Sequence, residues 1–203
     1  SWEHCYRVFR DARTDPSPDY DYLSLHLAFY LASWGMYRGS SFLLQKDYKV
    51  LSPIVEKVLK PEYDCLFGVA CADLRKLEVQ DSLEKLRKYI DGYFDPIREK
   101  VAGRKVTTSV SPVLITKILM GTLGCVPAYD RFFEEGARHL GLEKKSYNKD
   151  SLRELADFYE EHNDRLEEAR RGMRTDDLIY PQMKLLDMGL WQVGFERDAA
   201  GAK

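Results

Sequence analysis

The chain has 203 residues, of which 44% are hydrophobic and 32% are charged, and its formal net charge is −2. This composition is typical of a globular protein, and the length is sufficient for one compact domain with a real core. A slightly acidic chain has no bulk attraction for nucleic acid or membrane. Any polyanionic partner therefore requires a local basic patch.

The four cysteines include no CxxC pair, and Cys65 and Cys71 have no histidine nearby. We therefore expect no metal and no cofactor, with the cysteines acting as small buried hydrophobic residues in a reducing cytosol. The first residues are polar and charged, unlike a signal peptide, and the longest apolar run, 23–36, is interrupted and too short for a membrane span. These features predict a cytoplasmic protein with no membrane partner.

Helical patterns follow one another along the first part of the chain. Residues 19–39 are apolar nearly all round, which predicts a buried central helix that ends at Gly39. Residues 51–60 begin with Ser52 as the N-cap and a proline at the first helical position. Both segments therefore carry helix boundary signals as well as helical periodicity.

The remaining patterns are also helical, and local capping signals define most of their starts. Only residues 104–110 alternate like a strand, and this segment is short. The fold class predicted is mainly α, a single compact multi-helix domain over residues 1–203. The further helices expected are 81–94 with an Asp81–Glu84 capping box, 111–124 after a Ser-Pro pair, 127–142 with Pro127 in its first turn, 151–173 with a Ser151–Glu154 box, and one near 176–190.

A basic, hydroxyl-rich loop over residues 98–109 leads into the helix that Ser111 caps. A helix N-terminus presents unpaired N–H groups and partial positive charge, and nearby cations and hydroxyls complete a typical phosphate site. The alternative is a solvated loop before an ordinary cap. The DNA-backbone candidates are Lys46, Arg104, Lys105, Thr107, Thr108 and Ser109.

The stretch TKILMGTLGCVPAYDRFF follows this loop, and residues 98–133 together resemble part of the helix-hairpin-helix DNA glycosylases. In that family a lysine-bearing helix is followed by an apolar turn and a catalytic aspartate. The resemblance implies Asp130 as the catalytic carboxylate and Lys117 at the position of the lysine nucleophile. It also implies a helix-hairpin-helix glycosylase-like fold.

In size and helical content the chain is also similar to small anti-phage glycosylases that remove bulky modified cytosines. This similarity implies a monomeric, monofunctional DNA N-glycosylase that acts on double-stranded DNA with a flipped modified base and leaves an abasic site. A fixed carboxylate would stabilise the oxocarbenium-like transition state and orient the attacking water. The alternative for Asp130 is an acid that stabilises a helix start by roughly 0.3–1 kcal/mol.

Residues 31–49 combine aromatic, amide and basic side chains beside two glycines. An enzyme that extrudes a base holds it against aromatic faces and reads its edge with polar groups. For Trp34 alone, packing in the core is the favoured interpretation, whereas the cluster as a whole indicates a site. The substrate-binding candidates are Trp34, Tyr37, Arg38, Gln45 and Tyr129.

The sequence contains no Walker loop, G-x-S-x-G or H-E-x-x-H motif. A second hypothesis therefore stands beside base excision: a non-catalytic helical module of a defence system that binds nucleic acid or protein. The two hypotheses differ in whether a base is released from bound DNA.

Overall fold

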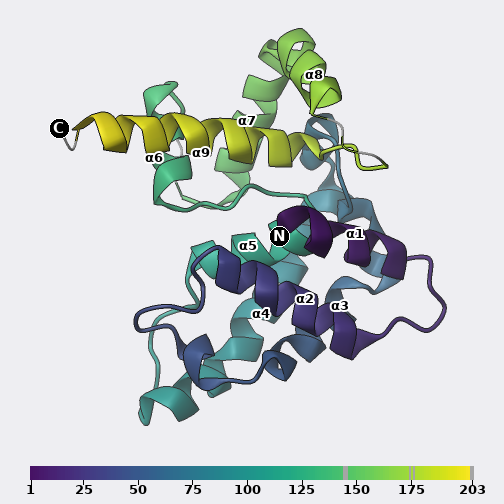
Figure 1. Ribbon diagram of the computed structural model, residues 1–203, viewed down its shortest axis with the longest axis vertical. Helices are drawn as coiled ribbons and strands as arrows, with labels where there is room; N and C mark the ends of the chain where they lie inside the picture. The colour runs from purple at the N-terminus through teal and green to yellow at the C-terminus, as the bar shows by residue number, and fades with distance from the viewer. Residues whose placement is uncertain (144–145, 174, 176, 202–203) are drawn as a thin grey trace. The chain divides into compact units, whose positions relative to one another are not determined.

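The computed structural model describes residues 1–143, 146–173, 175 and 177–201 (Figure 1). The described chain is mainly helical and contains no strand, and its only bridge of β type joins Thr175 to Leu178. Residues 104–110, which alternate like a strand in the sequence, form none. No helix in these described ranges combines the length and apolarity that crossing a membrane requires.

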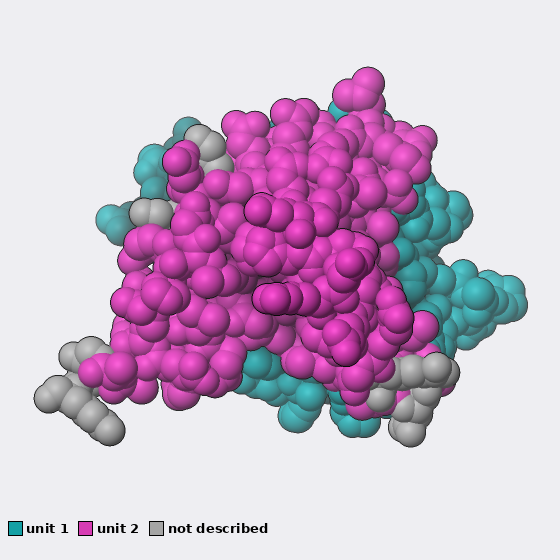
Figure 2. Space-filling model, turned by 90° about the horizontal axis from the view of Figure 1, so that it is seen from above, with its two compact units in different colours: residues 1–67, 81–123 teal, residues 68–80, 124–203 magenta. Residues whose placement is uncertain are grey.

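The described chain divides into two compact units, coloured teal and magenta in Figure 2. Unit 1 contains residues 1–67 and 81–123, and unit 2 contains residues 68–80 and 124–203. The prediction of one domain stays a prediction, and each unit is described by itself.

Unit 1 consists mostly of helices that pack around leucine, isoleucine and phenylalanine side chains. The fully buried residues include Leu27, Leu86 and Phe94, and the Trp2 indole donates to the carbonyl oxygen of Met120 at 3.0 Å. The helices are α1 Trp2–Ala12, α2 Tyr20–Ser33, α3 Ser52–Val58, α4 Leu77–Ala102, whose first turn belongs to unit 2, and α5 Pro112–Thr122, with short 3₁₀ turns η1 Phe42–Gln45, η2 Tyr48–Leu51 and η3 Pro61–Leu66.

The α2 helix differs from its prediction at its C-terminal end and on one face. Asp19 caps it by accepting the Tyr22 N–H at 3.0 Å, but the helix ends at Ser33 rather than at Gly39. The chain turns instead at Gly35, whose φ of +75° is one that glycine adopts without strain. Phe29 is 64% exposed, so the expectation of a helix buried on all sides is wrong for this face.

The starts of three other helices agree with the predicted capping signals in one case and differ from them in two. Ser111 is the N-cap of α5 with Pro112 directly after it, as expected. Ser52 is already helical, because the preceding 3₁₀ turn leads directly into α3 and Leu51 takes the cap position. The helix α4 begins at Leu77 rather than near Asp81, so the expected capping box there is wrong.

Unit 2 is organised by the close crossing of α6 Arg131–His139 and α9 Gln182–Gly201. A Cβ atom on Gly136 would lie 1.8 Å from the Leu190 carbonyl oxygen, and one on Gly194 would lie 1.9 Å from the Phe132 carbonyl oxygen. Real Cβ atoms do not approach other atoms so closely. The two glycines therefore let the backbones of the helices touch.

The other helices of unit 2 correct three sequence predictions. The expected helix over 151–173 is two helices separated at His162, and its capping box uses Asn148 with Ser151 rather than Ser151 with Glu154. The last helix begins after Pro181 instead of near residue 176. The elements are η4 Cys71–Arg75, α7 Lys149–Glu161, α8 Asn163–Gly172 and α9.

Candidate nucleic-acid interface

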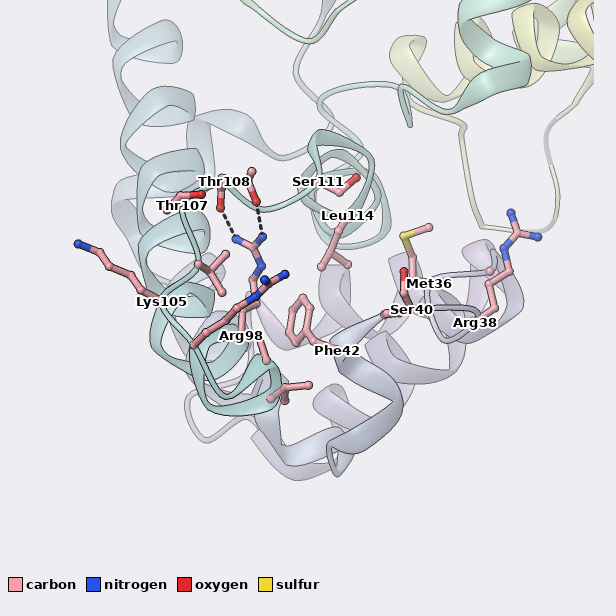
Figure 3. A pocket seen from close by; sticks show the side chains of 16 residues that line it. Met36, Arg38, Ser40, Phe42, Arg98, Lys105, Thr107, Thr108, Ser111 and Leu114 are labelled. Carbon is pink, nitrogen blue, oxygen red and sulfur yellow. Dashed lines mark hydrogen bonds between the residues drawn. The ribbon is translucent and has the colours of Figure 1, made fainter.

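A pocket of about 1030 Å³ lies in unit 1, where the segment after α2 meets the loop between α4 and α5 (Figure 3). Sequence analysis selects both segments separately, as residues 31–49 and 98–109, and the structure brings parts of them together. We refer to this site as the basic pocket. It is lined by Gly35, Met36, Arg38, Ser40, Ser41, Phe42, Arg98, Val101, Ala102, Arg104, Lys105, Val106, Thr107, Thr108, Ser111 and Leu114.

The charge of the basic pocket is of one sign. Four of its lining residues are arginine or lysine, and none of the described lining residues is aspartate or glutamate. Within the described ranges, Arg38, Arg104 and Lys105 are exposed and form no ion pair. In Figure 3, Arg38 and Lys105 extend from opposite sides of the pocket. A chain with net charge −2 therefore gathers unneutralised cations at one place.

Arg98 has a different role from the other three cations. Its guanidinium donates to the Thr108 carbonyl oxygen at 2.7 Å and to Thr108 Oγ1 at 3.1 Å, and it also contacts Asp95 at 3.3 Å. The side chain is only 15% exposed. The Val110 N–H donates to Asp91 at 2.8 Å. Arg98 and Asp91 of α4 thus hold the loop in place at the mouth of the pocket.

The N-terminus of α5 and several hydroxyls supply polar groups, while apolar side chains line the middle of the basic pocket. Ser111 lines the pocket as the N-cap of α5, where the helix presents partial positive charge. In Figure 3, Phe42 and Leu114 point into the space between Arg98 and Met36. The pocket therefore offers a surface for an apolar ring together with cations for a phosphate.

Sequence analysis names the cations and hydroxyls of this site but misses its apolar lining. Leu114 is 4% exposed and Phe42 is half-buried, and both are residue types of core positions, so nothing in the pattern marks them as pocket residues. Arg98 is part of the basic loop, but its hydrogen bonds to Thr108 depend on how the loop folds back on α4. Only the folded backbone shows which of these side chains reach the pocket.

Several predicted site residues do not line the basic pocket. Trp34 is 37% exposed and directly precedes the lining residue Gly35, so it is not a core residue. Burial and the negative charge of Asp47 raise the pKa of Tyr37. The other predicted residues outside the lining are Gln45 and Lys46 on the segment after α2, and Ser109 on the loop.

Lys117 lies on α5, one turn after Leu114, and is 4% exposed. Its ammonium donates to the Trp34 carbonyl oxygen at 2.8 Å and lies 5.9 Å from the centre of the Trp34 ring. The buried lysine thus joins α5 to the end of α2 directly beside the pocket-lining segment. This geometry gives Lys117 a structural function in unit 1.

Asp130 belongs to unit 2 and is the N-cap of α6, because the helix starts at Arg131 rather than near Pro127. Its carboxylate accepts the Phe133 N–H at 3.2 Å, and the side chain is half-buried. The carboxylate therefore caps the start of α6, as expected if Asp130 is an acid that stabilises a helix start.

The residues before Asp130 lie in the core of unit 2. Tyr129 is 2% exposed, and its hydroxyl is 2.8 Å from Ser151 Oγ. Burial raises the pKa of Tyr129 far above its ordinary value, so the phenol stays neutral. Its ring packs against Phe133 and Tyr147. The sequence predicts that Tyr129 binds substrate, but the structure buries this side chain in the core of unit 2.

The cysteines are reduced, and three of the four fit the prediction of burial. Cys5, Cys71 and Cys125 are buried, whereas Cys65 is exposed, which corrects the expectation for that residue. Burial raises the pKa of Cys71 to about 12, so this thiol is unreactive. Among the described residues, no three histidine, cysteine or acidic side chains come together as metal ligands would.

Comparison with known proteins finds no family model that matches the chain, and no curated protein or solved structure that is similar to it.

Proposed function

We propose that the chain binds nucleic acid, with the basic pocket of unit 1 as the contact to the phosphate backbone. The observation that carries this proposal is the set of exposed cations, Arg38, Arg104 and Lys105, around a pocket without a described acidic residue. Cations that form no ion pair with the described residues remain available for phosphates, and their binding releases counterions from the nucleic acid. Thr107 and Ser111 add hydroxyl groups of the type that contacts backbone oxygens.

The apolar middle of the pocket supports nucleic acid over a simple anion. Phe42 is half-buried and presents part of its ring to a base or a sugar, while the cations lie at the sides. An exposed aromatic ring, Trp34, lies next in sequence to the lining and offers a further stacking face. A phosphate ion alone would use only the polar part of this site.

Fluorescence anisotropy with labelled single-stranded and duplex DNA tests the proposal. We expect the triple variant Arg38→Gln, Arg104→Gln, Lys105→Gln to lose at least about tenfold in affinity at low salt. The matched control changes three exposed lysines of unit 1 that do not line the pocket, Lys60→Gln, Lys85→Gln and Lys88→Gln. Equal affinities of the two triple variants would overturn the assignment of the site.

Base excision is the second candidate function, and the fixed position of Asp130 favours it. A half-buried carboxylate at the end of a buried, hydrogen-bonded segment suits the stabilisation of positive charge on a sugar. In this reaction the bond between C1′ and the base nitrogen breaks, and its electron pair leaves with the base. The oxygen of water bonds to C1′, Asp130 accepts one of the water protons, and the base takes a proton from solvent.

Incubation of the protein with DNA that carries bulky modified cytosines, and with unmodified DNA, tests this second function. Heat or alkali breaks the strand at each abasic site, so strand breakage reports base release. Borohydride in the same reaction would trap a covalent complex if Lys117 acted as a nucleophile, and we expect none for hydrolysis by water. DNA binding without breakage of either substrate would leave a non-catalytic binding module.

A further inference from the structure

The helix α9 contacts the chain on both sides of Asp130. Before Asp130, the Ala128 N–H donates to Asp187 Oδ1 of α9 at 2.8 Å. After Asp130, the helix α6 touches α9 at Gly136 and Gly194 with no space for a side chain. The helix α9 therefore fixes the backbone directly before and directly after Asp130.

Asp187 is held in the interior of unit 2 as part of an ion pair. Its Oδ2 lies 2.8 Å from Lys184 Nζ, and the two residues are 8% and 5% exposed. A buried ion pair loses its hydration and is often no more stabilising than apolar residues of the same size. The specific role of the Asp187 carboxylate is to accept the hydrogen bond from the Ala128 N–H.

The segment that Asp187 contacts, residues 123–129, has backbone groups that need hydrogen-bond partners. Residues 123–129 are buried but are not helical, so their backbone groups lack the regular hydrogen bonds of a helix. Asp187 accepts the N–H of Ala128, and the next side chain, Tyr129, is fixed at its hydroxyl by Ser151. The two contacts precede Asp130 directly and limit how far its carboxylate moves.

We propose that Asp187 is a positioning residue that places the Asp130 carboxylate through Ala128. This inference rests on the base-excision function proposed above for Asp130. Asp187 itself takes no part in bond breaking. It acts through one hydrogen bond, and Lys184 neutralises its charge in the apolar interior.

Two double variants separate positioning from stability. Lys184→Met with Asp187→Leu replaces the ion pair by apolar residues and removes the acceptor for Ala128. Lys184→Met with Asp187→Asn also removes both charges but keeps an oxygen that accepts the N–H. We expect the first variant to release the base about tenfold to hundredfold more slowly at unchanged DNA affinity. The second should recover to within about threefold of the unaltered protein.

Both variants are measured below their melting temperatures, so a purely structural role would leave the two rates equal. Equal rates would overturn the inference. Hydrogen exchange at the Ala128 amide supplies a readout that does not need activity, and we expect faster exchange only in the Asp187→Leu variant. Unchanged exchange in that variant would overturn the inference, whereas absence of base release by the unaltered protein would overturn the excision function instead.

Discussion

The two candidate regions of the molecule differ in the exposure of their charged side chains. In unit 1, Arg38, Arg104 and Lys105 are exposed around the basic pocket. In unit 2, Asp130 caps a helix at the end of a buried segment, and a buried ion pair holds that segment. Exposed cations suit a partner of variable sequence, whereas a fixed carboxylate suits one reacting atom. The two regions thus differ in the way that the two proposed functions, backbone binding and base excision, would require.

The largest effect is expected at Asp130, where the proposed base excision places the chemistry. Asp130→Asn should reduce the rate of base release about 10³-fold, or about 4 kcal/mol, because the amide lacks the charge that stabilises the transition state. Stability and DNA affinity should change little, since asparagine is as good an N-cap as aspartate. The measurement is the single-turnover rate of strand breakage after alkali.

A matched control for this change exists in unit 1. Asp19 is also an N-cap aspartate, and it accepts the N–H of Tyr22. Asp19→Asn should leave the rate of base release unaltered. If Asp130→Asn released bases as fast as Asp19→Asn, the carboxylate of Asp130 would have only its capping role.

The next effect concerns the stability of unit 2, which depends on the close crossing of α6 and α9. Gly194→Ala places a methyl group against the Phe132 carbonyl and should lower the free energy of unfolding by about 3 kcal/mol. Gly189→Ala in the same helix meets no atom within 4 Å and should stabilise the helix by up to about 1 kcal/mol. Urea unfolding of both variants measures the difference, and equal stabilities would contradict the close crossing.

These residues also show how far the sequence predicts the structure. Local signals succeed where neighbours in the chain decide, as for the Ser111 cap of α5. The contact of Ala128 with Asp187 joins residues 59 positions apart, and no local pattern encodes it. The Gly136–Gly194 crossing is missed for the same reason. The pocket is intermediate, because its cations are visible in the sequence while its apolar lining requires the folded backbone.

A smaller effect concerns the acid stability of unit 2. The guanidinium of Arg170, with the Gln182 amide and the Tyr159 hydroxyl, lowers the pKa of Glu167 from 4.5 to about 2. The folded state therefore gains stability from the ionised form above about pH 4.5 and loses this gain as the pH falls toward 2. We expect the loss to be about 2 kcal/mol after allowance for solvent screening.

Urea unfolding from pH 5 to about pH 2 measures this dependence. The Glu167→Gln variant should show a flatter profile than the unaltered protein. Glu84 of α4 is the control, because Arg87 also lowers its pKa to about 2 but its ion-pair partners Arg87 and Lys88 lie on the same helix. Glu167, in contrast, also accepts hydrogen bonds from other helices. Glu84→Gln should change stability by less than about 1 kcal/mol. Parallel profiles of the Glu167→Gln variant and the unaltered protein would contradict the stabilising role of this network.

The salt dependence of DNA binding tests the central claim most directly, because it counts the phosphates that the protein contacts. With Kd measured from about 50 to 200 mM salt, each phosphate contact contributes about 0.9 to the slope of log affinity against log salt. The Arg38→Gln, Arg104→Gln, Lys105→Gln variant should lose about 3 from the slope of the unaltered protein. A slope that is the same in both proteins would contradict the assignment of the basic pocket as the nucleic-acid interface.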